Sequence, residues 1–169
     1  QVKGMSIGIV GYGRLGKIMA NFCSSFGANV FFYDPYIVDD LPHKRMSKLS
    51  DLVSHCRVIS LHPHVTDSSV GIINKKILDK MQNNSYVINT ARGEIVDESA
   101  IIDALDNGTI AGYATDVISD EFSDIRKSPI IKGMNRGLNI LVTPHIGGMS
   151  LEGPRLTYKW AFDKFRSIK

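Results

Sequence analysis

Residues 7–34 read IGIVGYGRLGKIMANFCSSFGANVFFYD, and they decide the fold that we predict for this chain. The apolar run at 7–10 is typical of a buried parallel strand. Apolar residues then recur every three or four positions over 15–26, which predicts a helix with one buried face. The residues of that face are Leu15, Ile18, Met19, Phe22 and Phe26. Gly27 ends the helix, and a second strand at 30–33 ends on Asp34.

Three glycines between the first strand and the helix follow the G-x-G-x-x-G spacing of dinucleotide-binding loops. Gly11 permits the tight turn out of the strand, Gly13 leaves room for a pyrophosphate against the backbone, and Gly16 lets the helix lie close to the sheet. The helix N-terminus points free N–H groups at the phosphates. Glycine triplets also occur in plain loops, but strand, glycines, amphipathic helix, strand and acid in this order predict a dinucleotide site.

Asp34 indicates which dinucleotide is bound. It ends the second strand, where a carboxylate can hold both hydroxyls of an adenosine ribose. The same carboxylate would repel a 2′-phosphate, so the expected cofactor is NAD rather than NADP.

The composition excludes several classes of protein. With 169 residues, 43% of them hydrophobic and 22% charged, the chain is expected to be one ordinary globular domain. A net charge of +3 without a basic run argues against nucleic acid as a partner, and no apolar stretch is long enough to cross a membrane. Cys23 and Cys56 lie outside any C-x-x-C motif, which predicts free thiols and a cytoplasmic protein.

Strands and helices alternate beyond residue 34. We expect strands at 58–61, 86–88, 110–117 and 140–142, a loop at 35–45 and a polar connection at 118–139. Helices are expected at 47–56, from the N-cap Asn74 through Met81, at 97–106 and after Ser150. This alternation predicts an α/β fold, a doubly wound parallel sheet of the Rossmann-like, NAD-binding type.

Polar residues follow the predicted strands where ligands bind in such sheets, outside the carboxyl ends. They are Asp34, His62, the run NTAR at 89–92, Asp116 and the run TPH at 143–145. Because parallel strands end at the same edge, we expect a catalytic site beside the dinucleotide.

Arg92, Glu121 and His145 are the candidates for chemistry. Arg92 directly follows a buried strand, and a buried or half-buried guanidinium there needs an anion, either a ligand carboxylate or a protein acid or helix terminus. His145 could be an ordinary hydrogen-bonded core residue, but Glu121 on the preceding connection can reach it. A carboxylate orients the imidazole and favours its protonated form, so the pair could exchange a proton with a carbonyl or hydroxyl group. With a hydride acceptor, this set describes the oxidation of a 2-hydroxy acid.

The chain resembles the cofactor-binding domain of the D-isomer-specific 2-hydroxyacid dehydrogenases. The resemblance rests on VGYGRLG (10–16), YDPY (33–36), NTARGEIVDESAIIDAL (89–105), ATDV (114–117) and TPHIGG (143–148). It implies an NAD-dependent enzyme that interconverts D-2-hydroxy acids and 2-oxo acids and forms a homodimer. It also implies that residues 1–169 are the NAD-binding domain and that a discontinuous substrate domain is absent from this chain.

The resemblance also implies roles for single residues. Arg92 would bind the substrate carboxylate and polarise the 2-oxo group, His145 would donate or accept the proton, and Glu121 would orient His145. Asp116 would accept from the nicotinamide carboxamide. No metal site is implied. The residues implied for NAD are Gly11, Gly13, Arg14, Leu15, Gly16, Asp34, Pro63, Thr90, Ala91, Arg92, Asp116, His145, Gly147 and Gly148.

The chain departs from the family pattern in three places. Phe122 follows Glu121 where the family usually has proline, and His64 stands where proline is common. The run KGMNRG at 132–137 resembles a small insertion. We expect His62 and His64 to be loop residues near the adenosine rather than catalysts.

Several alternatives remain open at this stage. In the last helix, Trp160, Phe162 and Phe165 would either face a missing partner or pack on the sheet. The chain alone is expected to bind NAD but to turn over little, because closure needs the second domain. A competing function is an NAD-dependent interaction module, such as a transcriptional corepressor. A hydrolase that uses bound NAD as an internal redox group is less favoured, because its motifs around the arginine and histidine differ.

Overall fold

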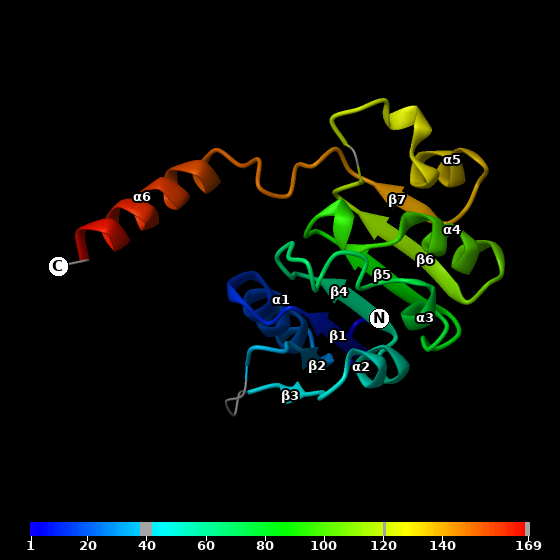
Figure 1. Cartoon of the computed structure of the whole chain (residues 1–169). Coiled ribbons are helices and arrows are strands. Elements are labelled where there is room, and N and C mark those ends of the chain that lie inside the picture. The colour runs from blue at the N-terminus through cyan, green and yellow to red at the C-terminus, as the bar shows by residue number, and fades with distance from the viewer. Residues whose placement is uncertain (38–41, 120, 168–169) are drawn as a thin grey trace.

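The centre of the molecule is a seven-stranded sheet, in a computed structural model that describes residues 1–37, 42–119 and 121–167. All strand pairs are parallel, in the order β3-β2-β1-β4-β5-β6-β7 (Figure 1). The strands are β1 (Ser6–Val10), β2 (Asn29–Tyr33), β3 (Lys44–Arg45), β4 (Val58–Leu61), β5 (Ser85–Asn89), β6 (Ile110–Thr115) and β7 (Ile140–Val142). All their carboxyl ends therefore meet at one edge of the sheet.

Helices cover both faces of this sheet. α1 (Arg14–Ser25) packs on β1 and β2 from one side. On the other face α2 (Leu49–His55), α3 (Lys75–Leu78), α4 (Glu98–Asp106) and α5 (Pro129–Asn135) form a row in which neighbours touch (Figure 1). Two short 3₁₀ turns, η1 (Gly93–Ile95) and η2 (Ile125–Lys127), complete the connections. The predicted doubly wound, Rossmann-like sheet is confirmed.

Side-chain alternation along β1 divides the core in two. Ile7 and Ile9 belong to a small core under α1, whereas Val10 belongs to the larger core under α2, α3 and α4. On the α1 side of the sheet the strands β5 to β7 are less well covered, and Leu141 is 63% exposed.

The predicted buried face of α1 is wrong. Leu15, Ile18, Phe22 and Phe26 are all exposed, and Met19 is only half-buried. The buried residues of α1 are Gly16 and Ala20. A Cβ at Gly16 would lie 2.1 Å from the carbonyl O of Gly11, so only glycine fits at this closest point between α1 and the loop after β1. Met19 and Cys23 pack against the small core, whereas the other four predicted side chains are exposed.

Other predicted elements differ in extent. The predicted polar connection contains the helix α5. Ser128 caps its first turn by accepting from the amide N of Ile130. Pro129 is the first residue of α5, a position whose amide would have no partner within the helix. The run at 132–137 forms the end of α5 and the turn after it. The expected loop at 35–45 contains the two-residue edge strand β3, although residues 38–41 of it lie outside the described residues. β6 ends at Thr115 rather than at residue 117.

Two predicted helix starts are confirmed by their caps. Asn74 accepts from the amide N of Ile77 at the start of α3, and Asp97 accepts from the amide N of Ala100 at the start of α4. Ser150 accepts from the amide N of Gly153, in the first turn of α6 (Glu152–Ser167).

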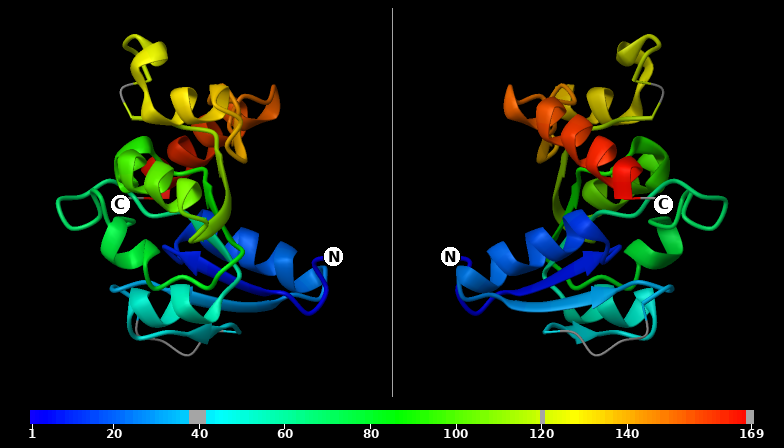
Figure 2. Two further views of the ribbon diagram at one scale, coloured as in Figure 1. Left: turned by 90° about the vertical axis from the view of Figure 1, so that its right-hand side faces the viewer. Right: turned by 90° about the vertical axis from the view of Figure 1, so that its left-hand side faces the viewer.

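α6 extends from the body of the fold, as the views in Figure 1 and Figure 2 show, and none of its described residues is buried. The alternative that Trp160, Phe162 and Phe165 pack on the sheet is therefore wrong, since at least half of each side chain is exposed. Trp160 instead lies over the guanidinium of Arg14, with 5.4 Å between Cζ and the ring centroid. Within the described part of the chain, no helix is long and apolar enough to cross a membrane.

Candidate functional site

The glycine-rich loop leads from β1 into α1 and leaves space for a ligand. Gly11 has a φ of +82°, and a Cβ there would lie 2.6 Å from the backbone N of Pro63. This close approach brings the predicted loop residue Pro63 beside the turn. A Cβ at Gly13 would meet nothing within 4 Å, and Gly13 offers no side chain to cap the first amides of α1. Open space and backbone N–H donors at a helix N-terminus together fit a pyrophosphate.

Asp34 is joined to this loop. Its Oδ2 accepts from the amide N of Tyr12 at 2.8 Å and its Oδ1 from the amide N of Tyr36 at 2.9 Å. The carboxylate is 9% exposed. Because a carboxylate oxygen can accept more than one hydrogen bond, Asp34 keeps capacity for the hydroxyls of a ribose. The loop and Asp34 therefore fit an adenosine dinucleotide.

The turn after β5 carries Thr90, Ala91 and Arg92, and Asn89 holds it in shape. Asn89 is fully buried; its Nδ2 donates to the carbonyl O of Arg92 and its Oδ1 accepts from the amide N of Ala91. The sequence places Asn89 in the polar run at a strand end but predicts no role of its own for this residue. A buried amide next to a candidate arginine was the signal that could have identified it as a residue that shapes the site.

Arg92 differs from the expectation that its guanidinium is buried or half-buried. Its side chain is exposed, and its Nη1 donates to the carbonyl O of Ala91 at 2.7 Å. Among residues 1–37, 42–119 and 121–167, no ion pair joins Arg92 to an acid. The guanidinium therefore remains available to an anionic ligand.

Asp116 follows β6 and binds the segment after β7. Its Oδ1 accepts from Thr143 Oγ1 and from the amide N of Ile146, and its Oδ2 accepts from the amide N of Gly147 at 2.8 Å. Burial alone would raise the pKa of this carboxyl, but the three hydrogen bonds together lower it below its usual value. Asp116 is therefore charged at neutral pH and orders the backbone around His145. Sequence reasoning missed Thr143 as its partner.

The predicted pair of Glu121 and His145 is present. Glu121 Oε1 lies 2.8 Å and Oε2 3.0 Å from His145 Nδ1. A carboxylate at neutral pH can only accept, so Nδ1 carries the hydrogen and Nε2 is left for a ligand. His145 has a φ of +53°, a left-handed conformation that is uncommon for residues other than glycine. The backbone at His145 is thus held in an unusual shape beside Gly147 and Gly148.

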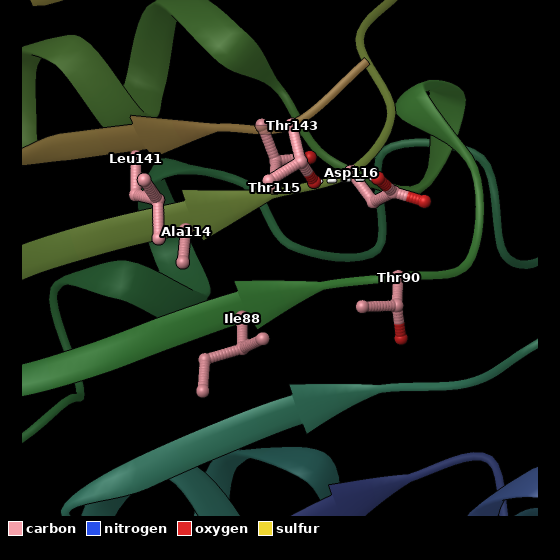
Figure 3. Close-up of a pocket in the computed structure, with 7 residues that line it drawn as sticks. All are labelled: Ile88, Thr90, Ala114, Thr115, Asp116, Leu141 and Thr143. Atoms are coloured by element: carbon pink, nitrogen blue, oxygen red, sulfur yellow. Dashed lines mark hydrogen bonds between the residues drawn. The ribbon is translucent and has the colours of Figure 1, made fainter. Parts of the chain in front are cut away.

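Two hollows lie at this edge of the sheet. One of about 440 Å³ is lined by Arg92, Gly93, Glu94, Val117, Ile118, Glu121, Phe122 and Ser123. Phe122, which replaces the proline usual in the resembled family, is almost fully exposed, and Glu121 nevertheless reaches His145. Figure 3 shows the second hollow. Thr90, Asp116 and Thr143 lie beyond the carboxyl ends of the strands, whereas Ile88, Ala114 and Leu141 lie within β5, β6 and β7.

The two histidines after β4 contact residues other than Glu121 and His145. His62 Nε2 is 2.9 Å from Ser60 Oγ, and burial lowers the pKa of His62. His64 is exposed in the loop, where its carbonyl O accepts from Ser69 Oγ. Within the described residues, no group of three His, Cys, Asp or Glu could hold a metal ion.

Comparison with known proteins links these features to one family. The family model described as D-isomer specific 2-hydroxyacid dehydrogenase, NAD binding domain, matches residues 1–147. D-3-phosphoglycerate dehydrogenase of Haemophilus influenzae is 35% identical over 155 residues, which are 90% of this chain and 37% of that protein. Glyoxylate reductase of Thermofilum pendens is 33% identical, again over 90% of this chain and over 44% of that protein. The chain thus spans less than half the length of these curated relatives.

Solved structures show the same likeness. D-lactate dehydrogenase with NAD⁺ from Lactobacillus jensenii has a TM-score of 0.78 and 32% identity, over 86% of this chain and 47% of that chain. D-lactate dehydrogenase from Escherichia coli has a TM-score of 0.80 and 29% identity, over 90% of this chain and 47% of that chain.

Proposed function

Because this chain belongs to the D-isomer specific 2-hydroxyacid dehydrogenase family, as its NAD-binding domain, we propose that it serves an enzyme that interconverts D-2-hydroxy acids and 2-oxo acids. The observation that carries the proposal is the hydrogen-bonded pair of Glu121 and His145 at the same sheet edge as Arg92 and the glycine-rich loop. An acid/base group, an anion-binding group and a dinucleotide loop are the parts that this reaction needs.

NAD is the cofactor, and it supplies the hydride chemistry at its nicotinamide ring. We assign its pyrophosphate to Gly11, Gly13 and Gly16 with the backbone of Arg14 and Leu15, and its ribose to Asp34. The nicotinamide end is assigned to Thr90, Ala91, Arg92, Asp116, His145, Gly147 and Gly148, with Pro63 on the adenosine side. The open space at Gly13 and the free amide face of α1 support this assignment.

In reduction of a 2-oxo acid, the chain's own residues would bind the substrate and deliver one proton. Arg92 binds the carboxylate with its planar fork of donors and polarises the neighbouring carbonyl. His145 Nε2 would give a proton to the carbonyl oxygen of the substrate, and Glu121 would stabilise the protonated imidazole through Nδ1. In oxidation of the 2-hydroxy acid, His145 takes the proton back.

The test is turnover of a panel of 2-oxo acids with NADH by the full-length protein. His145→Ala should lower kcat by about 10²–10⁴-fold, because it removes the proton donor. His64→Ala is the matched control, since His64 is exposed in a neighbouring loop, and it should retain wild-type kcat. Turnover by His145→Ala equal to that of the wild type would exclude the assigned role.

The relatives compared above are dehydrogenases and a reductase, so they offer no support for the interaction-module alternative.

We also propose that the protein is a homodimer and cytoplasmic. The exposed strip of Leu15, Ile18, Phe22 and Phe26 on α1 is the kind of apolar surface that a second copy would cover. Both cysteines, Cys23 and Cys56, are free, as is usual in a reducing compartment. Cell fractionation with an antibody to the protein tests the location.

A further inference from the structure

Glu98, the first residue of α4, is a carboxylate that is only 8% exposed. Its Oε1 accepts from the amide N of Ser119 at 2.6 Å, and its Oε2 accepts from Ser128 Oγ at 3.1 Å. A buried carboxylate is costly unless hydrogen bonds compensate, so these contacts are strong constraints on the groups that make them.

Two groups that donate to Glu98 are the two ends of one connection. Ser119 lies two residues before Glu121, and Ser128 caps α5 by accepting from the amide N of Ile130. The segment between them carries Glu121 and Phe122 along the wall of the 440 Å³ cavity. Glu98 therefore fixes both ends of this segment to the N-terminus of α4.

The same segment also lies against the turn that follows Arg92. A Cβ at Gly93 would lie 2.3 Å from both the carbonyl C of Ile118 and the amide N of Ser119. The backbone after β6 is thus in direct contact with the residue after Arg92. The turn that carries Arg92 and the backbone just before Glu121 are therefore packed directly against each other at Gly93.

We propose that Glu98 is a positioning residue that holds Glu121 against His145 for proton transfer, an inference that rests on the proposed function. Glu98 touches neither the substrate nor the cofactor in this scheme. It acts through Ser119 and Ser128, which set where the Glu121 carboxylate lies.

The experiment compares Glu98→Ala, Glu98→Gln and Asp97→Ala in the full-length protein. Glu98→Ala should lower kcat by about 10- to 100-fold, as expected for a misplaced catalytic group, while KM for NADH changes less than about twofold. Glu98→Gln keeps an acceptor for the Ser119 amide and should recover most of kcat. Asp97→Ala removes the neighbouring helix cap but no bond to the connection, so it should lower Tm and leave kcat unchanged.

A double-mutant cycle separates positioning from general destabilisation. In a Glu121→Ala background, which has no acceptor for His145 Nδ1, Glu98→Ala should cost less than about twofold further in kcat, because its route of action is already lost. An equal loss of kcat in both backgrounds would overturn the proposal. So would a loss of kcat in Asp97→Ala as large as that in Glu98→Ala, or no loss in Glu98→Ala.

A spectroscopic measurement keeps this inference separate from the proposed function. In ¹⁵N spectra of the imidazole, Glu98→Ala should remove the signature of the His145 Nδ1 hydrogen bond, and Asp97→Ala should keep it. If wild-type protein turns over no 2-oxo acid, the proposed function fails, and this spectrum still decides the positioning role. An unchanged His145 spectrum in Glu98→Ala would overturn it.

Discussion

At the scale of single residues, the glycines of the loop have two separate physical roles. Gly16 is required by the protein itself, because a Cβ there would collide with the carbonyl O of Gly11. Gly13 is surrounded by open space, so the protein alone does not require it. We propose that the reason for a glycine at 13 is the ligand that approaches the backbone.

This difference predicts opposite outcomes for two alanine substitutions. Gly16→Ala should lower the free energy of unfolding by about 1–3 kcal/mol, through overpacking, and should also weaken NADH binding. Gly13→Ala should leave stability within about 0.5 kcal/mol and weaken NADH binding alone. Urea denaturation measures the free energy of unfolding. Quenching of the fluorescence of Trp160, the one tryptophan of the chain, measures NADH binding, because its ring lies against Arg14 at the start of α1.

The two variants serve as controls for each other. A Gly13→Ala protein with unchanged affinity for NADH would show that no phosphate approaches this loop. A Gly16→Ala protein of unchanged stability would contradict the close approach of α1 and β1.

At the scale of elements, one carboxylate joins the end of β6 to the segment that follows β7. Asp116 receives hydrogen bonds from Thr143, Ile146 and Gly147, residues that flank His145 on both sides. These bonds lower the pKa of Asp116 against the opposing effect of burial. The position of the segment after β7 therefore depends on the charge of a residue about thirty positions earlier in the chain.

A depressed pKa makes this link a source of acid sensitivity. In the folded state Asp116 holds its proton more weakly than at its usual pKa of 3.8, so the unfolded state binds more protons at low pH. The stabilisation is present above about pH 4 and is lost as the pH falls through the folded-state pKa. Asp116→Asn should lower stability by about 1–3 kcal/mol at pH 7 and flatten the dependence below pH 4.

Urea midpoints between pH 2.5 and pH 7 measure this dependence. Asp67→Asn is a suitable comparison, because Asp67 is an exposed loop carboxylate, and it should follow the wild-type curve. If the urea midpoint of Asp116→Asn depended on pH as strongly as that of the wild type, Asp116 would not be the source of the acid sensitivity.

At the scale of the whole molecule, large apolar side chains are exposed on α1, on the end of the sheet at β7 and on α6. The outward strip of α1, the partly open face of β5 to β7 and the exposed aromatic residues of α6 contrast with the well-filled core under α2, α3 and α4. A surface of this kind is typical of an interface.

Phe22→Lys tests whether α1 forms the proposed homodimer. A charge in the middle of the strip should shift the mass measured by analytical ultracentrifugation from dimer to monomer. Val70→Lys places the same charge on an exposed loop residue outside the strip and should leave the dimer intact. A wild-type monomer, or a dimer of Phe22→Lys as stable as that of the wild type, would contradict the proposal.

The 169-residue chain alone should separate binding from catalysis. We expect it to bind NADH, because the loop and Asp34 are present in it. We expect 2-oxo-acid reduction far below the roughly 10 s⁻¹ of a typical enzyme, because we propose that closure of a second domain excludes water. Stopped-flow absorbance at the NADH band measures both, with the full-length protein as the reference. Turnover near 10 s⁻¹ by the chain alone would contradict this view.

The fold class, the dinucleotide loop and the residue types of the site could be predicted from the sequence. They depend on local rules: glycine where a turn or close approach requires it, apolar periodicity, and polar residues after strands that share one direction. The strand–glycine–helix–strand–acid order at 7–34 and the three residues Arg92, Glu121 and His145 are of this kind.

Only the tertiary structure decided which groups meet. The buried face of α1 follows from how closely Gly16 approaches Gly11, which hydrophobic periodicity does not measure. The exposure of Arg92 was not expected from the sequence. The hydrogen bonds that Glu98 accepts from Ser119 and Ser128 join residues 21 and 30 positions apart in the chain. Strand order and loop packing bring those residues together, and neither is written in any local stretch of the sequence.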